Sequence, residues 1–131
     1  MKEHSLIYSP IGGAGEIGMN MYAYGFKTKD KISYILVDAG VSFPKMESEP
    51  GVDLIFPNPR LILNNLRDLE GIFITHAHED HLGAIGFIAS KIDCKIFCRK
   101  FTAAIVKDKL KKVNVSEKRV VTVEEWPFEV K

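Results

Sequence analysis

The chain has 131 residues, of which 46% are hydrophobic and 27% are charged, and its formal net charge is +1. This composition excludes a disordered chain, the length allows one domain at most, and the charge balance excludes a protein that is basic over its whole surface. No apolar run reaches the roughly 18 residues of a membrane span, and the first residues lack the apolar segment of a secretory signal. We therefore expect a cytoplasmic protein with no membrane partner.

Short strands and helices alternate along the chain. Residues 41–59 contain four prolines and predict a long irregular loop. The helix over 102–112 is predicted to begin with Thr102 as its cap. The alternation indicates an α/β layered fold. Apolar and alternating runs predict strands over 6–8, 20–26, 32–37, 72–75, 95–99 and 120–123, and helical spacing predicts helices over 60–69, 82–90 and 102–112.

Three of the four histidines fall within residues 76–81, which read His-Ala-His-Glu-Asp-His. If the strand before this run stays extended, His76 and His78 point the same way, and a helix starting near Leu82 turns Asp80 and His81 back toward them. Neutral imidazole and carboxylate are ligands of divalent metals such as Zn²⁺. The run therefore predicts two ligand pairs for two adjacent metals, a pattern that helix capping alone does not explain. Glu79 lies between the pairs and is equally compatible with a site role and with a solvated surface.

A glycine loop precedes the second predicted strand. Residues 13–18 match GxGxxG, and Asp38 stands twenty residues after the last glycine, as in dinucleotide-binding proteins. That fingerprint requires a helix at the third glycine, whereas residues 20–26 are typical of a strand. We therefore favour a glycine turn, formed by Gly13, Gly15 and Gly18, that approaches the metal pocket and leaves room for a phosphate. Asp38 would support the histidine loop by orienting an imidazole N–H.

The run at residues 76–81 has the form HxHxDH and is identified as the signature of the metallo-β-lactamase superfamily of binuclear metallohydrolases. Residues 12–20 (GGAGEIGMN), 35–44 (ILVDAGVSFP) and 50–57 (PGVDLIFP) resemble the start of the bacterial ribonuclease J family, in the β-CASP branch. The resemblance implies the N-terminal half of an αββα sandwich and two zinc ions in a complete site. It assigns His76 and His78 to one metal and Asp80 and His81 to the other, the latter two also as catalytic residues.

The same resemblance implies a further ligand histidine, a bridging aspartate and a last histidine downstream, but no histidine follows His81. We therefore expect residues 1–131 to be part of one catalytic domain, without the β-CASP and C-terminal domains. Such a chain is expected to hold zinc weakly or not at all, to be inactive alone, and to self-associate through an exposed apolar sheet face. The complete protein would cut RNA internally and from its 5′ end, in RNA processing and decay.

Two other functions remain open. One is a different hydrolase of the same superfamily, acting on a thioester, a lactam or a tRNA precursor. The other is a non-catalytic fragment that binds RNA or a partner through the basic stretch 91–119, whose net charge is +7 (ten Lys or Arg against three acids). Its possible RNA contacts are Lys107, Lys109, Lys111 and Lys112. The two cysteines, Cys94 and Cys98, have no partner pair and are expected to be reduced and structural.

Overall fold

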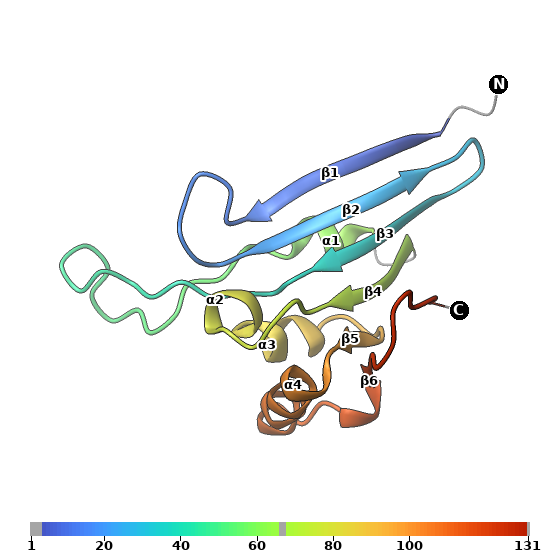
Figure 1. Cartoon of the computed structure of the whole chain (residues 1–131). Coiled ribbons are helices and arrows are strands. Elements are labelled where there is room, and N and C mark those ends of the chain that lie inside the picture. Colours follow the sequence, from blue (N-terminus) through green and yellow to red (C-terminus); the bar gives the residue numbers. More distant parts are fainter. Residues whose placement is uncertain (1–3, 66–67, 131) are drawn as a thin grey trace.

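Figure 1 shows the computed structural model of the chain, which describes residues 4–65 and 68–130. A six-stranded sheet in the order β1-β2-β3-β4-β5-β6 organises the molecule. The first three strands are antiparallel neighbours, and β3 to β6 run parallel with helices in the connections. The predicted α/β class is confirmed. The elements are β1 (Ser5–Gly12), β2 (Met21–Lys27), β3 (Ile32–Val37), α1 (Arg60–Asn64), β4 (Leu69–Phe73), α2 (Glu79–Leu82), α3 (Ile85–Ala89), β5 (Ile96–Cys98), α4 (Lys100–Lys112), the 3₁₀ turn η2 (Glu117–Arg119) and β6 (Val120–Thr122).

The hydrophobic core lies on one face of the sheet, beneath α2, α3 and α4. Strand register places Leu36, Ile72 and Ile96 side by side on three adjacent strands, and all three are fully buried. Burying one such side chain stabilises a fold by roughly 1.5–3 kcal/mol. The strand residues of the core pack with helix residues Leu82, Ile85, Ile88, Val106 and Leu110.

The opposite face of β1 and β2 carries apolar side chains that remain exposed. Leu6 pairs with Phe26, and Tyr8 pairs with Tyr24, across these two strands. Leu6 is 85% exposed, and the other three are about half exposed. Further along the sheet, Phe73 of β4 stacks on Phe97 of β5 on this same face. In the described part of the chain, the helices cover only the other face (Figure 1).

The prediction of one continuous helix over residues 82–90 is wrong, because the structure has two short helices in this region. Helix α2 begins at Glu79, inside the histidine run, and α3 begins at Ile85. The break falls at Gly83 and Ala84, where the Ala84 N–H donates to the carbonyl of Ala39 at 2.8 Å instead of to a helical acceptor. A tertiary hydrogen bond therefore interrupts a helix that the apolar spacing predicts to be continuous.

Other boundaries also differ from the prediction. Helix α4, predicted over 102–112, begins at Lys100. Thr102 is a buried residue within its first turn, so Thr102 is not the cap. Strand β4 runs from Leu69 to Phe73 rather than over 72–75. The predicted helix over 60–69 is helical at Arg60–Asn64; residues 66–67 lie outside the described residues, and Leu69 already belongs to β4.

Both cysteines are free, as predicted. Cys98 is buried in β5, and this burial raises the pKa of its thiol to about 11. Burial also raises the pKa of Cys94, although the nearby Arg119 opposes the shift. No helix among the described residues is long and apolar enough to cross a membrane.

Candidate metal centre

The histidine loop rests on the segment that follows β3. The backbone N–H groups of Ala39 and Val41 donate to the carbonyls of His81 and Glu79 at 2.8 and 3.0 Å. These bonds act like an extra pairing between the end of β3 and helix α2. They hold the start of α2 at the carboxyl end of β3 and β4, the edge at which the functional groups of parallel sheets usually gather.

Gly40 lies at the tightest point of this contact. A Cβ atom on Gly40 would lie 1.7 Å from the Asp80 carbonyl oxygen and 2.9 Å from the Asn20 nitrogen. The Gly40 N–H donates to the Asn20 carbonyl at 2.9 Å, and the Asn20 N–H donates to the Asp80 carbonyl at 3.0 Å. Three backbone segments therefore meet here at a separation that only glycine permits.

The donor atoms of the loop come together as two pairs. Nε2 of His76 lies 3.2 Å from Nδ1 of His78, and Oδ2 of Asp80 lies 3.5 Å from Nε2 of His81. Two ligands on one tetrahedral zinc, each about 2.05 Å from the ion, are about 3.3 Å apart. The donor sets and separations of both pairs therefore fit a divalent metal.

The two pairs are neighbours, since the His76 and His81 rings have centroids 4.1 Å apart. Even so, no group of three or more His, Cys, Asp or Glu side chains within residues 4–65 and 68–130 is arranged to hold one ion. Catalytic zinc usually has three protein ligands. Each pair in the described part of the chain thus offers two donors, one fewer than a catalytic zinc usually takes from a protein.

Asp38 is buried beneath the loop, with 3% of its surface exposed and a positive φ of 63°. Its carboxylate lies 2.8 Å from Nδ1 of His81. It also accepts from the backbone N–H of Thr75 at 2.8 Å and from the Thr75 hydroxyl at 2.9 Å. Because Asp38 takes the Thr75 N–H, β4 ends before the histidines. Asp38 thus stands where the sequence predicts a residue that orients an imidazole.

Asn20 and Tyr22 are site residues that the sequence reasoning missed. The Asn20 side-chain amide donates to the Asp80 carbonyl at 3.0 Å and lies 3.4 Å from Nε2 of His81. The Tyr22 hydroxyl donates to the amide oxygen of Asn20 at 2.8 Å, which fixes the orientation of the amide. Burial raises the pKa of Tyr22, with nearby Tyr8 and Asp38 adding to the shift, so the hydroxyl keeps its proton. The only available signal was the position of Asn20 at the end of the glycine loop.

The glycine loop approaches the site at one of its three predicted residues. A Cβ on Gly13 would lie 2.5 Å from the Tyr22 hydroxyl and 2.7 Å from the Asn20 amide oxygen. Gly18 faces Ser42, and a Cβ on Gly15 would meet no atom within 4 Å. All three have positive φ values. A strand follows Gly18, as predicted, rather than the helix that dinucleotide binding would require.

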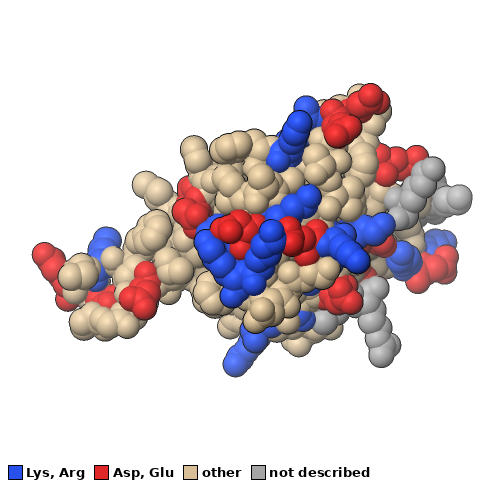
Figure 2. Space-filling view, turned by 90° about the horizontal axis from the view of Figure 1, so that it is seen from below, with Lys and Arg blue, Asp and Glu red and all other residues tan. Residues whose placement is uncertain are grey.

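The four lysines proposed as RNA contacts lie on α4, but three of them are paired with acids. Lys109 forms an ion pair with Glu79 at 2.9 Å. Lys112 pairs with Asp108 at 2.7 Å, and Lys111 pairs with Glu117 at 3.3 Å. Figure 2 shows acidic and basic side chains side by side on this side of the molecule. These pairings reduce the positive potential that the sequence alone suggests for Lys107, Lys109, Lys111 and Lys112.

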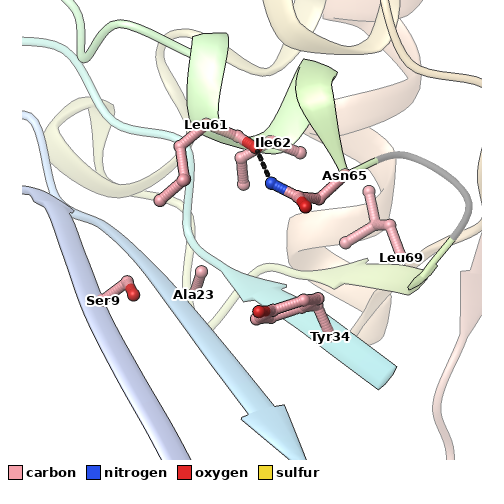
Figure 3. A pocket seen from close by; sticks show the side chains of 7 residues that line it. All are labelled: Ser9, Ala23, Tyr34, Leu61, Ile62, Asn65 and Leu69. Carbon is pink, nitrogen blue, oxygen red and sulfur yellow. Dashed lines mark hydrogen bonds between the residues drawn. The ribbon is translucent and has the colours of Figure 1, made fainter. Parts of the chain in front are cut away.

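A separate apolar cavity lies between α1 and the sheet. Leu61 and Ile62 face Ala23, Ser9 and Tyr34 across it, as Figure 3 shows. Its volume is about 50 Å³, which is far smaller than the 300–1,000 Å³ of typical ligand pockets. None of the histidine-loop residues lines it. We therefore interpret it as a gap in the packing under α1 and not as part of the metal centre.

The fold and the paired donors define a class of protein. Residues 28–130 match the profile of the Metallo-beta-lactamase superfamily, and the chain belongs to that superfamily. A divalent metal is therefore the expected cofactor of the histidine loop.

Among its relatives, the chain is 40% identical over 108 residues to ribonuclease J of Sinorhizobium meliloti, a match that covers 82% of this chain and 19% of the relative. It is 35% identical over 117 residues to ribonuclease J 2 of Staphylococcus saprophyticus, covering 89% and 20%. It is 38% identical over 109 residues to ribonuclease J 2 of Staphylococcus epidermidis, covering 83% and 19%. The predicted resemblance to ribonuclease J is confirmed, and the chain spans about a fifth of the length of these relatives.

Proposed function

We propose that this chain contributes half of the binuclear zinc centre of a ribonuclease that hydrolyses RNA phosphodiester bonds. The observation that carries the proposal is the two donor pairs, one of His76 with His78 and one of Asp80 with His81, at separations of 3.2 and 3.5 Å. RNA as the substrate, and cleavage both internally and from the 5′ end, rest on the similarity to ribonuclease J. A cytoplasmic location agrees with this role and remains a prediction.

Two bound metals would activate a water molecule and neutralise charge on the phosphoryl group. The residues of this chain would hold the metals and orient their ligands. His76 and His78 would hold one metal through neutral imidazole nitrogens, and Asp80 and His81 would hold the other. Asp38 would keep His81 in the tautomer whose Nε2 is free to bind, because its carboxylate accepts a hydrogen bond from the Nδ1–H group.

Residues 1–131 alone are proposed to bind zinc weakly or not at all and to leave RNA intact. Each pair offers two protein ligands where catalytic zinc takes three, and the parts of a catalytic unit fail together rather than by degrees. Elemental analysis and zinc titration of the purified chain test the first claim. We expect less than stoichiometric zinc, and a further loss in His76→Ala or His78→Ala. His4→Ala is the matched control, since His4 stacks on Phe26 outside the loop.

Stoichiometric, tightly held zinc would show that the ligand assignment is incomplete or that a second copy completes it. Activity is tested with 5′-monophosphorylated RNA and added Zn²⁺ or Mn²⁺. Metal-dependent degradation by the 131-residue chain would contradict its proposed inactivity. Hydrolysis of a thioester or lactam, but not RNA, by a longer version with a complete ligand set would favour a different hydrolase of the superfamily.

Self-association is proposed through the open face of β1 and β2. Leu6, Tyr8, Tyr24 and Phe26 form one exposed apolar surface there, and such surfaces tend to become interfaces. Light scattering should show a species larger than a monomer, and Leu6→Glu with Phe26→Glu should shift it toward the monomer. Ile17→Glu is the control, because Ile17 is 95% exposed in the glycine loop, away from this face. A monomeric wild-type chain would contradict the proposal.

A further inference from the structure

Thr75 connects the buried carboxylate of Asp38 to the first histidine of the loop. The Thr75 hydroxyl lies 3.0 and 2.9 Å from the two carboxylate oxygens of Asp38. On its other side, the same oxygen lies 2.9 Å from Nδ1 of His76. Thr75 itself is exposed, so hydrogen bonds rather than packing hold its hydroxyl in place.

The number of available protons decides which group donates in each of these hydrogen bonds. An ionised carboxylate can only accept, and a threonine hydroxyl has one proton and two lone pairs. At 2.9 Å from Asp38, the hydroxyl proton must point at the carboxylate, because otherwise two sets of lone pairs would face each other. The remaining short contact of the hydroxyl, to His76, can then be made only if Nδ1 of His76 carries a proton and donates a hydrogen bond to the Thr75 oxygen.

This assignment leaves the other ring nitrogen of His76 free. Nε2 of His76 then presents a lone pair toward His78, whose Nδ1 lies 3.2 Å away. His81 has the same arrangement, since its Nδ1 lies 2.8 Å from Asp38 and its Nε2 lies beside Asp80. Asp38 therefore acts on His81 directly and on His76 through Thr75, so one carboxylate reaches both donor pairs.

We infer that Thr75 is a positioning residue that holds His76 in its Nδ1–H tautomer, with Nε2 ready to bind a metal. The use of that nitrogen by zinc rests on the proposed function, but the tautomer itself does not require a metal. A purely structural Thr75 would instead only close the end of β4 through its backbone N–H. Thr75→Val keeps the backbone bond and the shape of the side chain but removes the hydroxyl, and Thr75→Ser keeps the hydroxyl.

The test measures the histidine tautomers of the metal-free 131-residue chain by long-range ¹H–¹⁵N correlation spectroscopy. The pH is raised until the ring ¹⁵N chemical shifts stop changing, so that the spectra report the tautomers of the neutral rings. We expect His76 to carry its proton on Nδ1 in the wild type and in Thr75→Ser, and to move it to Nε2 in Thr75→Val. His81 should keep its Nδ1 proton in all three, because its bond to Asp38 does not pass through Thr75.

A wild-type His76 protonated on Nε2 would overturn the inference without any variant, and so would a Thr75→Val chain that keeps the Nδ1 proton. Zinc titration is the second readout. Loss of such an outer hydrogen bond typically weakens metal binding 10- to 100-fold, so we expect at least a tenfold loss for Thr75→Val and less than a twofold change for Thr75→Ser. If no version binds zinc, as two ligands per pair allow, the tautomers alone decide the inference, because they require no bound metal.

Discussion

The two donor pairs of the histidine loop are held in different ways. His76 and His78 follow the end of β4, and the described contacts of their side chains are to Thr75 and to the rings of the loop itself. Asp80 and His81 belong to α2, whose backbone is bonded to residues 39–41. Asn20 and Asp38 hold their side chains as well.

This difference indicates which pair is preorganised for binding. A metal site gains affinity when its ligands are already fixed by surrounding hydrogen bonds, because less side-chain entropy is lost on binding. The Asp80–His81 pair has that support from two separate segments of the chain, at Asn20 and at residues 38–41. The His76–His78 pair depends on the single path through Thr75. We therefore expect changes around α2 to have larger effects on the fold than changes around the first two histidines.

The largest effect is expected from Gly40→Ala, which would separate α2 from its support. The added Cβ would lie 1.7 Å from the Asp80 carbonyl oxygen, so the backbone must move. We expect the free energy of unfolding to fall by about 3 kcal/mol or more, measured by urea denaturation. Gly86→Ala in α3 is the control, since its Cβ would meet only ordinary contacts at 3.4 Å. An equal, small effect of both changes would show that the contact at Gly40 is loose.

The second change, Asp38→Asn, acts on both pairs at once. Asparagine tolerates the positive φ of 63° at this position, so the loss is confined to the charge and to acceptor capacity. We expect zinc affinity to fall 10- to 100-fold and the free energy of unfolding to fall by about 2 kcal/mol. Competition titration with a zinc chelator measures the affinity. Asp53→Asn, in an exposed loop position, is the control. Equal zinc affinities of Asp38→Asn and this control would show that Asp38 has no role in metal binding.

Asn20→Ala should weaken the Asp80–His81 pair and spare the other. It removes an amide that contacts Asp80 and His81, at an expected cost of about 1–2 kcal/mol in stability. Its effect on zinc affinity should be larger in a His76→Ala background, where only the second pair remains, than in the wild type. Tyr22→Phe, which leaves the amide in place but frees its orientation, should show a smaller loss. An unchanged zinc affinity when Asn20→Ala is added to the His76→Ala chain would mean that Asn20 does not act on that pair.

The smallest effect is expected from Glu79→Gln, which removes the ion pair with Lys109 on α4. The Glu79 side chain is about half exposed, and exposed pairs contribute at most about 1 kcal/mol. We expect a change in unfolding free energy below that value, diminishing as salt is added, and an unchanged zinc affinity. Lys109→Met, which removes the other partner of the ion pair, should give the same small loss of unfolding free energy and the same unchanged zinc affinity. A tenfold loss of zinc affinity in Glu79→Gln alone would instead give Glu79 a direct role in the site.

The sequence predicted that the donor atoms of residues 76–81 lie close together more accurately than it predicted the elements around them. The spacing of residues 76–81 was sufficient to expect two donor pairs, because the ligands are close in the chain and local geometry brings them together. The break between α2 and α3 could not be predicted, since it depends on a hydrogen bond from Ala84 to the distant Ala39. The apolar pattern carries no information about that partner.

The same distinction applies to charge. A count of lysines along α4 suggested a basic strip, but their acidic partners include Glu79, thirty residues earlier in the chain. Only the ion pairs of the folded chain, such as that between Lys109 and Glu79, show that these charges are partly neutralised. Sequence spacing gives the sign of a charge and its place on a helix, and the neighbours decide how much of its field reaches solvent.

By itself, the amino-acid sequence determined the α/β class, the superfamily signature and the residue types of the histidine loop, because these depend on residue types at short spacings. The tertiary structure alone decided how the donors are oriented. Asp38, Asn20 and Gly40 are 37 to 61 residues away from the groups that they contact at Thr75, Asp80 and His81, and nothing in a local pattern connects them. The hydrogen bonds and close backbone contacts that prepare a metal site form only when those distant segments meet at one edge of the sheet.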